Sequence, residues 1–216
     1  MKTFLTELKT SIFLTLVLAV LLCGAYPLAV WLGGQVLFAR QANGSLVVDR
    51  SGAVRGSELL AQNFSSDRYF QPRPSVAGTG YDAANSSGSN LGPTSEKLAR
   101  GVHAKDAAGR PVDDPGNFDG ITDLVAAYRS ANRLGPNDAV PADAVTRSAS
   151  GLDPHISLAN AEIQARRVAR VRGLALDRVQ ALVAAHTQGR GLGVFGEPTV
   201  NVLLLNVALD GVNRNQ

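Results

Sequence analysis

The chain has 216 residues, which is room for one globular domain beside a membrane anchor. It carries 21 basic and 18 acidic side chains, and from Arg40 onwards the counts are 19 and 17. Such a small surplus does not form the dense basic patch of a nucleic-acid-binding domain, so we expect no nucleic-acid partner. The single cysteine, Cys23, excludes an intramolecular disulfide and a cysteine metal site from this chain.

An apolar stretch near the N-terminus is the clearest feature. Residues 10–39 form a run of 30 positions without a charged side chain. A helix needs about 20 apolar residues to cross a hydrocarbon core of roughly 30 Å. We therefore predict a cytoplasmic tail at 1–10, a transmembrane helix at 11–33 and an extracytoplasmic domain at 34–216.

A cleaved signal peptide is the alternative interpretation of this stretch. Such peptides have an apolar core of about 7–15 residues and a small-x-small cleavage site. Cys23-Gly24-Ala25 offers such a site, but the apolar character continues beyond it. Leu22 stands where a lipoprotein site has a small residue. We therefore favour an uncleaved anchor.

The orientation of the anchor is not decided by counting basic residues. Lys2 and Lys9 precede the apolar stretch, whereas Arg40, Arg50 and Arg55 follow it. Long domains are translocated largely regardless of their charges. Because a short basic tail before an apolar segment is typical of a secretory signal, we predict a cytoplasmic N-terminus and a C-terminal domain outside.

The first stretch beyond the anchor is rich in turn residues. We predict a short strand at 45–49 and a short helix at 58–64, the helix being capped by Ser57. The segment 69–75 contains two prolines and is predicted to be irregular. The segment 86–94 consists mainly of Gly, Ser and Asn, and its composition is that of a disordered linker.

The next stretch, 105–137, is polar and leans towards acidic residues. We predict a helix at 121–128 within it and a closing turn at 135–138. The whole stretch is interpreted as a surface excursion from the domain.

The C-terminal stretch has the most regular pattern. Ser157 is placed to cap a helix that Gly173 ends, and a second helix is predicted at 177–186. Residues 200–209 are apolar apart from two asparagines and are predicted to be a strand that passes into a buried helix. The core stripe of the first helix is Leu158, Ala161, Ala165, Val168 and Ala169.

Three arginines of the helix that follows Ser157 form a separate face. Arg166, Arg167 and Arg170 are close enough in helical projection to point to one side. Such a face could meet anionic lipid or an acidic partner, but an isolated charged face is usually solvated, and we interpret it so.

The chain shows no complete catalytic or metal-binding motif. Asp153-Pro154-His155 places one carboxylate beside one imidazole, which is an incomplete site. Ser148-x-Ser150-Gly151 lacks the glycine pattern of a nucleophile elbow. The backbone N–H groups of loop 86–90 could bind an anion, but no helix follows the loop and no lysine is suitably placed. His103 and His186 are interpreted as structural residues. We predict no catalytic residue and no metal site, and expect an accessory subunit or binding domain.

Seven sequence blocks, in order and suitably spaced, carry a family resemblance. They are QANGSL (41–46), RGSELLAQNF (55–64), YFQPRPS (69–75), SGSNL (87–91), SASGLDPHIS (148–157), RVAR (167–170) and GEPTVNVLLLNVALD (196–210). With the anchor, the chain resembles the C subunit family of the Kdp potassium-transporting P-type ATPase. The segment 105–137 matches least, and no shared function is expected there.

The resemblance implies an α+β extracytoplasmic domain with one N-terminal transmembrane helix, in the bacterial cytoplasmic (inner) membrane. It also implies that the loops with linker-like composition are ordered. The implied partners are the lipid bilayer, a potassium-conducting subunit and an ATP-hydrolysing subunit. The implied role is that of an accessory subunit that supports assembly and stability of the complex, with no covalently bound cofactor.

The family is also described as a catalytic chaperone that raises the ATP affinity of the hydrolytic subunit. By that description Leu59-Leu60-Ala61-Gln62 resembles part of an ABC-type signature loop, with Ser57 and Gln62 as nucleotide contacts. Ala61 replaces the usual glycine and weakens the likeness. A domain outside the cell also does not share a compartment with cytoplasmic ATP, so we favour a structural role.

Three small residues are candidates for close helix packing in the membrane, namely Gly24, Gly33 and Gly34. Ala175 stands where the family commonly has a helix-capping serine. Two other functions stay open. One is an independent membrane-anchored binding protein, and the other is a hydrolase that uses Ser150 or Asp153 with His155.

Overall fold

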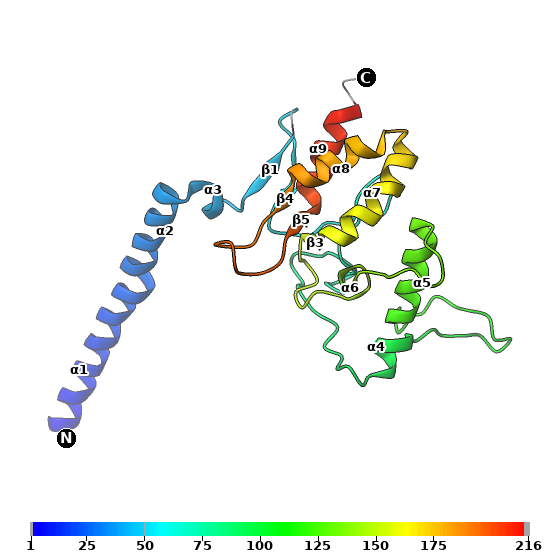
Figure 1. The fold of residues 1–216 in the computed structure, drawn as a ribbon. Coiled ribbons are helices and arrows are strands. Elements are labelled where there is room, and N and C mark those ends of the chain that lie inside the picture. The colour runs from blue at the N-terminus through cyan, green and yellow to red at the C-terminus, as the bar shows by residue number, and fades with distance from the viewer. Residues whose placement is uncertain (1, 50, 214–216) are drawn as a thin grey trace. The chain divides into compact units, whose positions relative to one another are not determined.

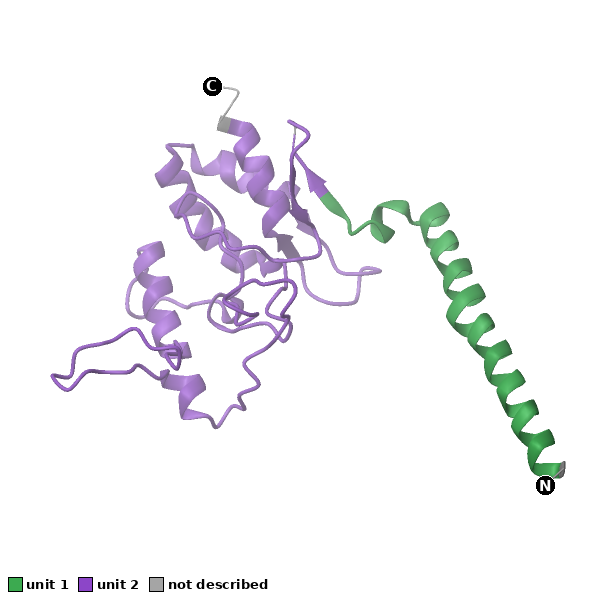
Figure 2. Ribbon diagram, turned by 180° about the vertical axis from the view of Figure 1, so that it is seen from behind, with its two compact units in different colours: residues 1–46 green, residues 47–216 purple. Residues whose placement is uncertain are grey.

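A computed structural model describes residues 2–49 and 51–213 of the chain. The chain divides into two compact units, residues 1–46 and residues 47–216 (Figure 2). The first unit is helical, and the second combines short strands with helices. The mixed helix and strand content confirms the predicted α+β class.

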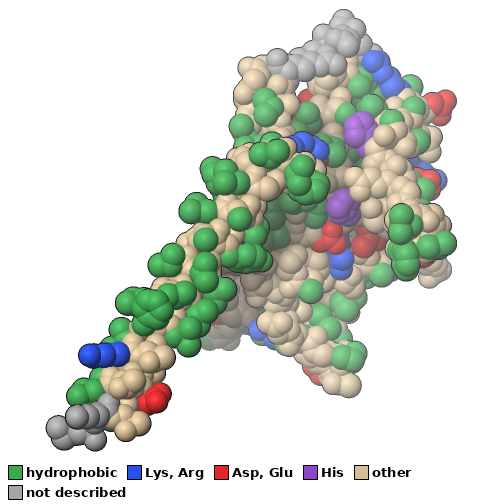
Figure 3. Space-filling model, turned by 90° about the vertical axis from the view of Figure 1, so that its left-hand side faces the viewer, with side chains coloured by type: hydrophobic (Ala, Val, Ile, Leu, Met, Phe, Trp, Pro, Cys, Tyr) green, Lys and Arg blue, Asp and Glu red, His purple; other side chains and the backbone are tan. Residues whose placement is uncertain are grey.

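Unit 1 is dominated by one long helix. It consists of α1 (Lys2–Ala19), the π-helical turn η1 (Val20–Ala25) and α2 (Tyr26–Leu37). The stretch Thr3–Leu37 has a mean hydropathy of 2.4 over its most apolar window, none of which is buried within the chain. Hydrophobic side chains cover most of its visible face (Figure 3). The helix is long and apolar enough to cross a membrane, and it extends beyond the predicted bounds 11–33.

The π-helical turn has a local cause in the sequence. Pro27 has no N–H, so it cannot complete the bond to the carbonyl four residues before it. The residue before the proline is Tyr26, and its N–H donates to the Leu21 carbonyl, five residues back, which is the π-helical spacing. A wider turn ahead of a proline thus lets the helix continue. After Leu37 the short helix α3 (Ala39–Ala42) follows.

The core of unit 2 lies between a three-stranded sheet and three helices. The strands are β3 (His155–Ser157), β4 (Thr187–Gln188) and β5 (Thr199–Asn201), in the antiparallel order β3-β5-β4. The helices α7 (Leu158–Arg172), α8 (Leu176–Ala185) and α9 (Val202–Asn213) lie around this sheet (Figure 1). The core cluster is Phe70, Ile156, Ala161, Ala165, Val168, Ala169, Leu174, Val179, Val183, Val200, Val202, Leu205 and Leu209.

The helices of this core follow the sequence closely. The Ser157 hydroxyl accepts a hydrogen bond from the Asn160 N–H (3.1 Å), and Gly173 ends α7 in the left-handed conformation. Both limits were predicted, as was the strand that passes into α9. Ala175 caps α8 without a side-chain hydrogen bond.

The first part of unit 2 departs from the prediction. Strands β1 (Leu46–Val48) and β2 (Val54–Ser57) form a two-stranded sheet, and the predicted helix 58–64 is wrong. The Glu58 carbonyl accepts from the Asn201 side chain (2.7 Å), and the Ala61 N–H donates to the Leu152 carbonyl (2.9 Å). Because distant partners bind these backbone groups, they are not available for helical hydrogen bonds.

The segment 86–94 is irregular but ordered, so its interpretation as a linker by composition is wrong. The Ser87 N–H and the Ser86 hydroxyl both donate to the Ser150 carbonyl (3.0 and 2.9 Å). A Cβ on Gly88 would lie 2.7 Å from the Ala149 carbonyl oxygen. The glycine therefore lets the two backbones touch.

The remaining helices are α4 (Glu96–Arg100), α5 (Ile121–Asn132) and α6 (Ala142–Val145). Helix α5 begins where it was predicted and reaches Asn132, four residues beyond the expected end. The loop between α4 and α5 projects from the rest of unit 2 (Figure 1). The bridges Val102–Phe118 and Lys105–Pro111 hold its two arms together.

Candidate functional site

A pocket of unit 2 lies beside α9 and has a volume of about 590 Å³. The β1–β2 sheet, the loop after it, the irregular segment around Tyr69 and one face of α9 form its walls. The lining residues are Val48, Asp49, Arg55, Gln62, Phe64, Tyr69, Leu203, Asn206, Val207, Ala208, Asp210 and Gly211.

Gln62, one of the two nucleotide contacts implied by the resemblance, lines this pocket. Gly56 lies against it, and a Cβ at that position would overlap the Gln62 amide. Gly56 also has φ +143°, which a residue with a side chain rarely adopts. Among the residues that the structure describes, none forms a hydrogen bond with the Gln62 amide. Its hydrogen-bonding capacity is therefore available to a ligand.

Ser57, the other implied contact, ends β2 and is half-buried. Its hydroxyl accepts from the Leu59 N–H (3.2 Å), and its carbonyl accepts from the Leu60 N–H (3.2 Å). Ser57 thus fixes the turn that follows β2. It is not among the residues that line the pocket of Gln62.

Two carboxylates of the pocket are already paired within the chain. Asp49 accepts from Ser51 and from Arg55, and these hydrogen bonds, in that order of effect, hold its pKa far below the ordinary value. Asp210 accepts from the Tyr69 hydroxyl (3.0 Å) and from Arg172 (2.8 Å). Among the described lining residues, Arg55 is the one basic side chain, and it is bound to Asp49.

The wall at Tyr69 is held by side-chain amides instead of a neighbouring strand. Asn206 accepts from the Phe70 N–H and donates to the Phe70 carbonyl, both at 2.9 Å. Gln164 does the same for Gln71, at 2.7 and 3.0 Å. Each amide thus satisfies both backbone groups of one residue, as a paired strand would. This explains how the predicted irregular segment 69–75 becomes rigid.

Arg167 is also part of this support, and its assignment to a solvated face is wrong. Its side chain is 1% exposed, whereas Arg166 and Arg170 are exposed as expected. Its nitrogens donate to Asn132 (3.1 Å), Gln164 (2.8 Å), the Tyr69 carbonyl (3.0 Å) and Asp67 (3.2 Å). Burial lowers the pKa of Arg167, and Asp67 opposes that effect.

The sequence carried a signal for one of the three buried side chains that hold segment 69–75, namely Asn206, but not for Gln164 or Arg167. Asn206 interrupts the apolar run 202–209, and a polar residue on a buried face must find partners. Gln164 and Arg167 carried no such signal, because they belong to a helix with many polar residues. Their partners lie about a hundred residues away in the chain.

The structure does not assemble a serine hydrolase site around His155. The Asp153 carboxylate lies 3.5 Å from His155 Nδ1 and forms an ion pair with Arg73 (3.1 Å). Burial, the largest effect, raises the pKa of Asp153, but the hydrogen bonds from His155 and Arg73 outweigh it and lower the pKa overall. The Ser150 hydroxyl accepts from the Leu152 N–H (3.1 Å), and within the described chain no hydrogen bond joins it to His155.

The three membrane glycines lie in unit 1. A Cβ on Gly24 or Gly33 would meet nothing within 4 Å, and one on Gly34 would meet only the Ala42 Cβ, at 3.8 Å. Close packing within this chain therefore does not require glycine at these positions. The prediction that they pack against a partner helix is not tested by this geometry.

Comparison with known proteins places the chain in a family. The family described as "K+-transporting ATPase, c chain" matches residues 8–211. A "Potassium-transporting ATPase KdpC subunit" of Rhodospirillum rubrum is 50% identical over 206 residues, which is 95% of this chain and 96% of the relative. Proteins of the same description from Mycobacterium tuberculosis and Myxococcus xanthus are 48% and 51% identical, covering 94% and 96% of this chain and 97% and 87% of the relatives. The chain therefore belongs to the KdpC family, the c chain of potassium-transporting ATPases.

Proposed function

We propose that this chain is an accessory subunit of an ATP-driven, high-affinity potassium uptake pump, needed for assembly and stability of the complex. The observation that carries the proposal is the family match over residues 8–211, which includes the apolar helix as well as unit 2. A single span cannot form an ion path alone, so partner subunits conduct potassium and hydrolyse ATP.

The proposed assembly role is tested by removing the chain from a complex that otherwise contains every subunit. We expect the potassium-conducting and ATP-hydrolysing subunits to dissociate in mild detergent when it is missing. A complex that stays intact and transports potassium at the normal rate without the chain would contradict the proposal.

The proposed topology has the N-terminus in the cytoplasm and unit 2 outside. The long apolar helix and the few charges before it support this orientation. Cys23 is the single cysteine, so a Cys23→Ser chain carrying Ala108→Cys has one thiol, in an exposed loop of unit 2. We expect an impermeant thiol reagent to label it in intact spheroplasts. Labelling only after lysis would place unit 2 in the cytoplasm and contradict the proposed topology.

The anchor is proposed to pack against the potassium-conducting subunit through Gly24, Gly33 and Gly34. Small residues let membrane helices approach closely, and no described residue lies within 4 Å of a Cβ placed on Gly24 or Gly33. We expect Gly33→Leu to reduce co-purification of the conducting subunit. Ala29→Leu is the matched control, because Ala29 is exposed on the same helix. Equal recovery with both variants would count against this packing site.

The described lining of the pocket gives little support to a direct contact between Gln62 and ATP. Asp49 and Asp210 line the pocket, and the described lining arginine, Arg55, is already paired with Asp49. We propose that any effect on ATP affinity acts through the assembly. Gln62→Ala, with exposed Gln188→Ala as its control, should leave the ATP affinity of the complex unchanged. A selective loss with Gln62→Ala would support direct nucleotide binding.

An independent extracytoplasmic binding protein stays the second candidate, because the Gln62 amide faces a sizeable pocket without a bonding partner among the described residues. Purification from native membranes separates the two functions. The pump subunit predicts a stable hetero-oligomer, whereas an independent binding protein predicts a lone chain that carries a small ligand.

A further inference from the structure

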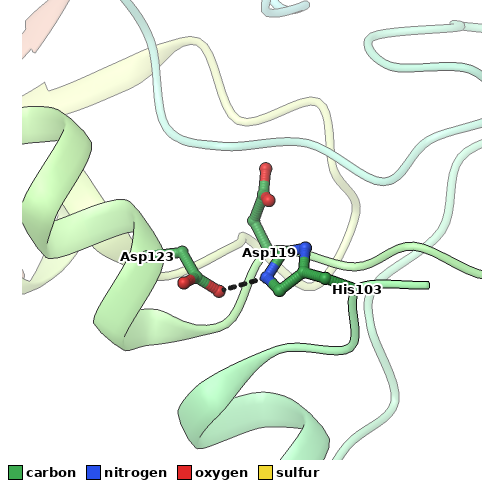
Figure 4. A group of neighbouring side chains, drawn as sticks. All are labelled: His103, Asp119 and Asp123. Carbon is green, nitrogen blue, oxygen red and sulfur yellow. Dashed lines mark hydrogen bonds and ion pairs between the residues drawn. The ribbon is translucent and has the colours of Figure 1, made fainter. Parts of the chain in front are cut away.

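His103, Asp119 and Asp123 meet at the base of the loop that projects between α4 and α5 (Figure 4). Their ligand atoms all lie within 4.8 Å of one another. His103 Nε2 is 3.0 Å from Asp123 Oδ2. The three residues come from the two arms of the loop and from the first turn of α5, so their meeting is a product of the fold.

The backbone around the three residues is fixed on both sides. Val102 and Phe118 exchange two hydrogen bonds of 2.8 Å, and the Ala104 N–H donates to the Asn117 side chain (2.7 Å). His103 is thereby held beside the segment that leads to Asp119.

Two glycines allow the third segment to approach. A Cβ on Gly120 would overlap the Gly101 backbone nitrogen, and a Cβ on Gly101 would overlap the Asp123 carboxylate. The Gly120 N–H also donates to Asp123 Oδ2 (2.8 Å). The start of α5 can therefore lie directly against the segment that carries His103.

The donor atoms are accessible and partly free. The Asp119 carboxylate is exposed and makes no hydrogen bond to any described residue, whereas its backbone carbonyl accepts from Arg147 (3.0 Å). Asp123 accepts from His103 and Gly120 through Oδ2, and no described residue donates to its other oxygen. Each of the three residues can thus present one ligand atom to the same point.

We propose that His103, Asp119 and Asp123 bind a divalent transition-metal ion of the zinc type. Zinc takes imidazole nitrogen and carboxylate oxygen at about 2.0–2.2 Å, which sets ligand atoms roughly 3.4 Å apart in a tetrahedron. The ligand atoms lie within 4.8 Å of one another, and the Asp119 side chain is exposed, so its rotation can adjust this spacing. Water completes the coordination, and the imidazole ligand favours zinc over calcium, which takes oxygen ligands.

Neighbouring cations limit the affinity of this site. Arg147 and Lys97 both lie over the Phe118 ring, at 4.1 and 5.2 Å from its centre, and Arg147 interacts electrostatically with Asp119. A bound ion would form a clamp, that is, a link between the base of the projecting loop and the first turn of α5. Helix α5 in turn supplies Tyr128 to Asn160 (2.8 Å), so the clamp acts on a helix that contacts α7.

The test is a titration of the full-length, tag-free chain in detergent with Zn²⁺ alone, read by calorimetry against a chelator of known affinity. We expect one equivalent of Zn²⁺ to bind, and roughly tenfold or more loss of affinity in both His103→Ala and Asp119→Asn. Asp119→Asn keeps the backbone carbonyl that Arg147 binds, so it removes the ligand and leaves the fold. His186→Ala and Asp114→Asn are matched controls and should bind as the natural chain does.

Titration with Co²⁺ in place of Zn²⁺ supplies a second readout, because tetrahedrally coordinated Co²⁺ absorbs visible light intensely. Added Ca²⁺ should not displace the bound Co²⁺, so the absorption should stay unchanged. Absence of binding would overturn the proposal. So would binding that His103→Ala and Asp119→Asn leave unchanged, because the ion would then lie elsewhere. Loss in His103→Ala alone would overturn the three-residue site as well.

Discussion

Residues 67–75 and residues 102–120 are both irregular, yet the hydrogen bonds that order them differ in range and burial. In the first segment, the backbone of Phe70 and Gln71 is bound by Asn206 and Gln164, whose side chains are buried. In the second, Asp106 accepts from the Ala108 and Arg110 N–H groups at its exposed tip. One segment is fixed by residues about a hundred positions away, and the other by its immediate neighbours.

The difference shows which irregular segments matter to the stability of the domain. A buried hydrogen bond that loses one partner leaves the other group unsatisfied in a medium of low dielectric constant. An exposed hydrogen bond that is lost is replaced by water. We therefore expect mutations in the support of 67–75 to lower the free energy of unfolding of unit 2, and mutations at the tip of 102–120 to change it little.

The largest effect is expected for Arg167→Met. The change removes the guanidinium that donates to Asp67, to the Tyr69 carbonyl and to the buried amides of Asn132 and Gln164, which costs about 3–5 kcal/mol. Urea unfolding of the chain in mild detergent, followed by far-ultraviolet circular dichroism, measures it. Arg166→Met is the matched control, because Arg166 is exposed. Equal stability of the two variants would refute the structural role of Arg167.

Asn206→Leu should have the next largest effect. It leaves the N–H and the carbonyl of Phe70 unpaired in the core, at a cost of about 2–4 kcal/mol in unfolding free energy. The same change at exposed Asn63 should be close to neutral, and unfolding curves of the two variants make the comparison. A near-neutral Asn206→Leu would show that Phe70 does not need this amide.

Alkaline pH should lower the free energy of unfolding through Tyr81, whose hydroxyl binds the end of segment 67–75. The Tyr81 hydroxyl donates to the Arg73 carbonyl (2.9 Å), and burial raises the pKa of Tyr81 to about 12. Because the folded state holds the proton more tightly, this stabilisation is complete below pH 10 and is lost as the pH rises from 10 to 12. The loss approaches about 2 kcal/mol.

Unfolding curves at pH 9 and pH 11.5 check this, with Tyr81→Phe as the reference. Burial also raises the pKa of Tyr128, so only the difference between the chains reports Tyr81. If the natural chain and Tyr81→Phe lost the same stability over this range, titration of Tyr81 would not be responsible.

The smallest effect is expected for Asp106→Asn, at the tip of the loop. Its carboxylate binds Arg110 in an exposed ion pair, and water can replace those bonds. The urea midpoint should stay within the error of the measurement. A clear fall in the midpoint would mean that the projecting loop is coupled to the core, and the contrast between the two segments would fail.

Local sequence signals were enough for the regular elements. Ser157 and Gly173 delimit α7, and the apolar helix of unit 1 follows from its composition. The helix predicted after Ser57 is wrong, because Asn201 binds the Glu58 carbonyl from across the domain. The solvated face assigned to Arg167 is wrong for the same reason, since its partners come from 67–69 and from α5.

The sequence could predict single residues of the candidate site, but not which residues lie together in it. The resemblance singled out Ser57 and Gln62, and the structure places Gln62 alone in the lining of the pocket. The pairing of Asp49 with Arg55 and of Asp210 with Arg172 was not visible in the sequence. The meeting of His103 with Asp119 was equally hidden, because it depends on the close approach of Gly101 and Gly120.

Local patterns in the sequence were sufficient to predict the apolar helix and the helices with caps and periodic stripes, because these depend on residues a few positions apart. The family resemblance, which the comparisons confirm, was also visible in the sequence. Which polar side chains are buried and which irregular segments are rigid depends on the tertiary fold. A hydrogen bond between Gln164 and Gln71 leaves no local pattern, since its two partners are 93 residues apart in the chain and are brought together only by the packing of the core.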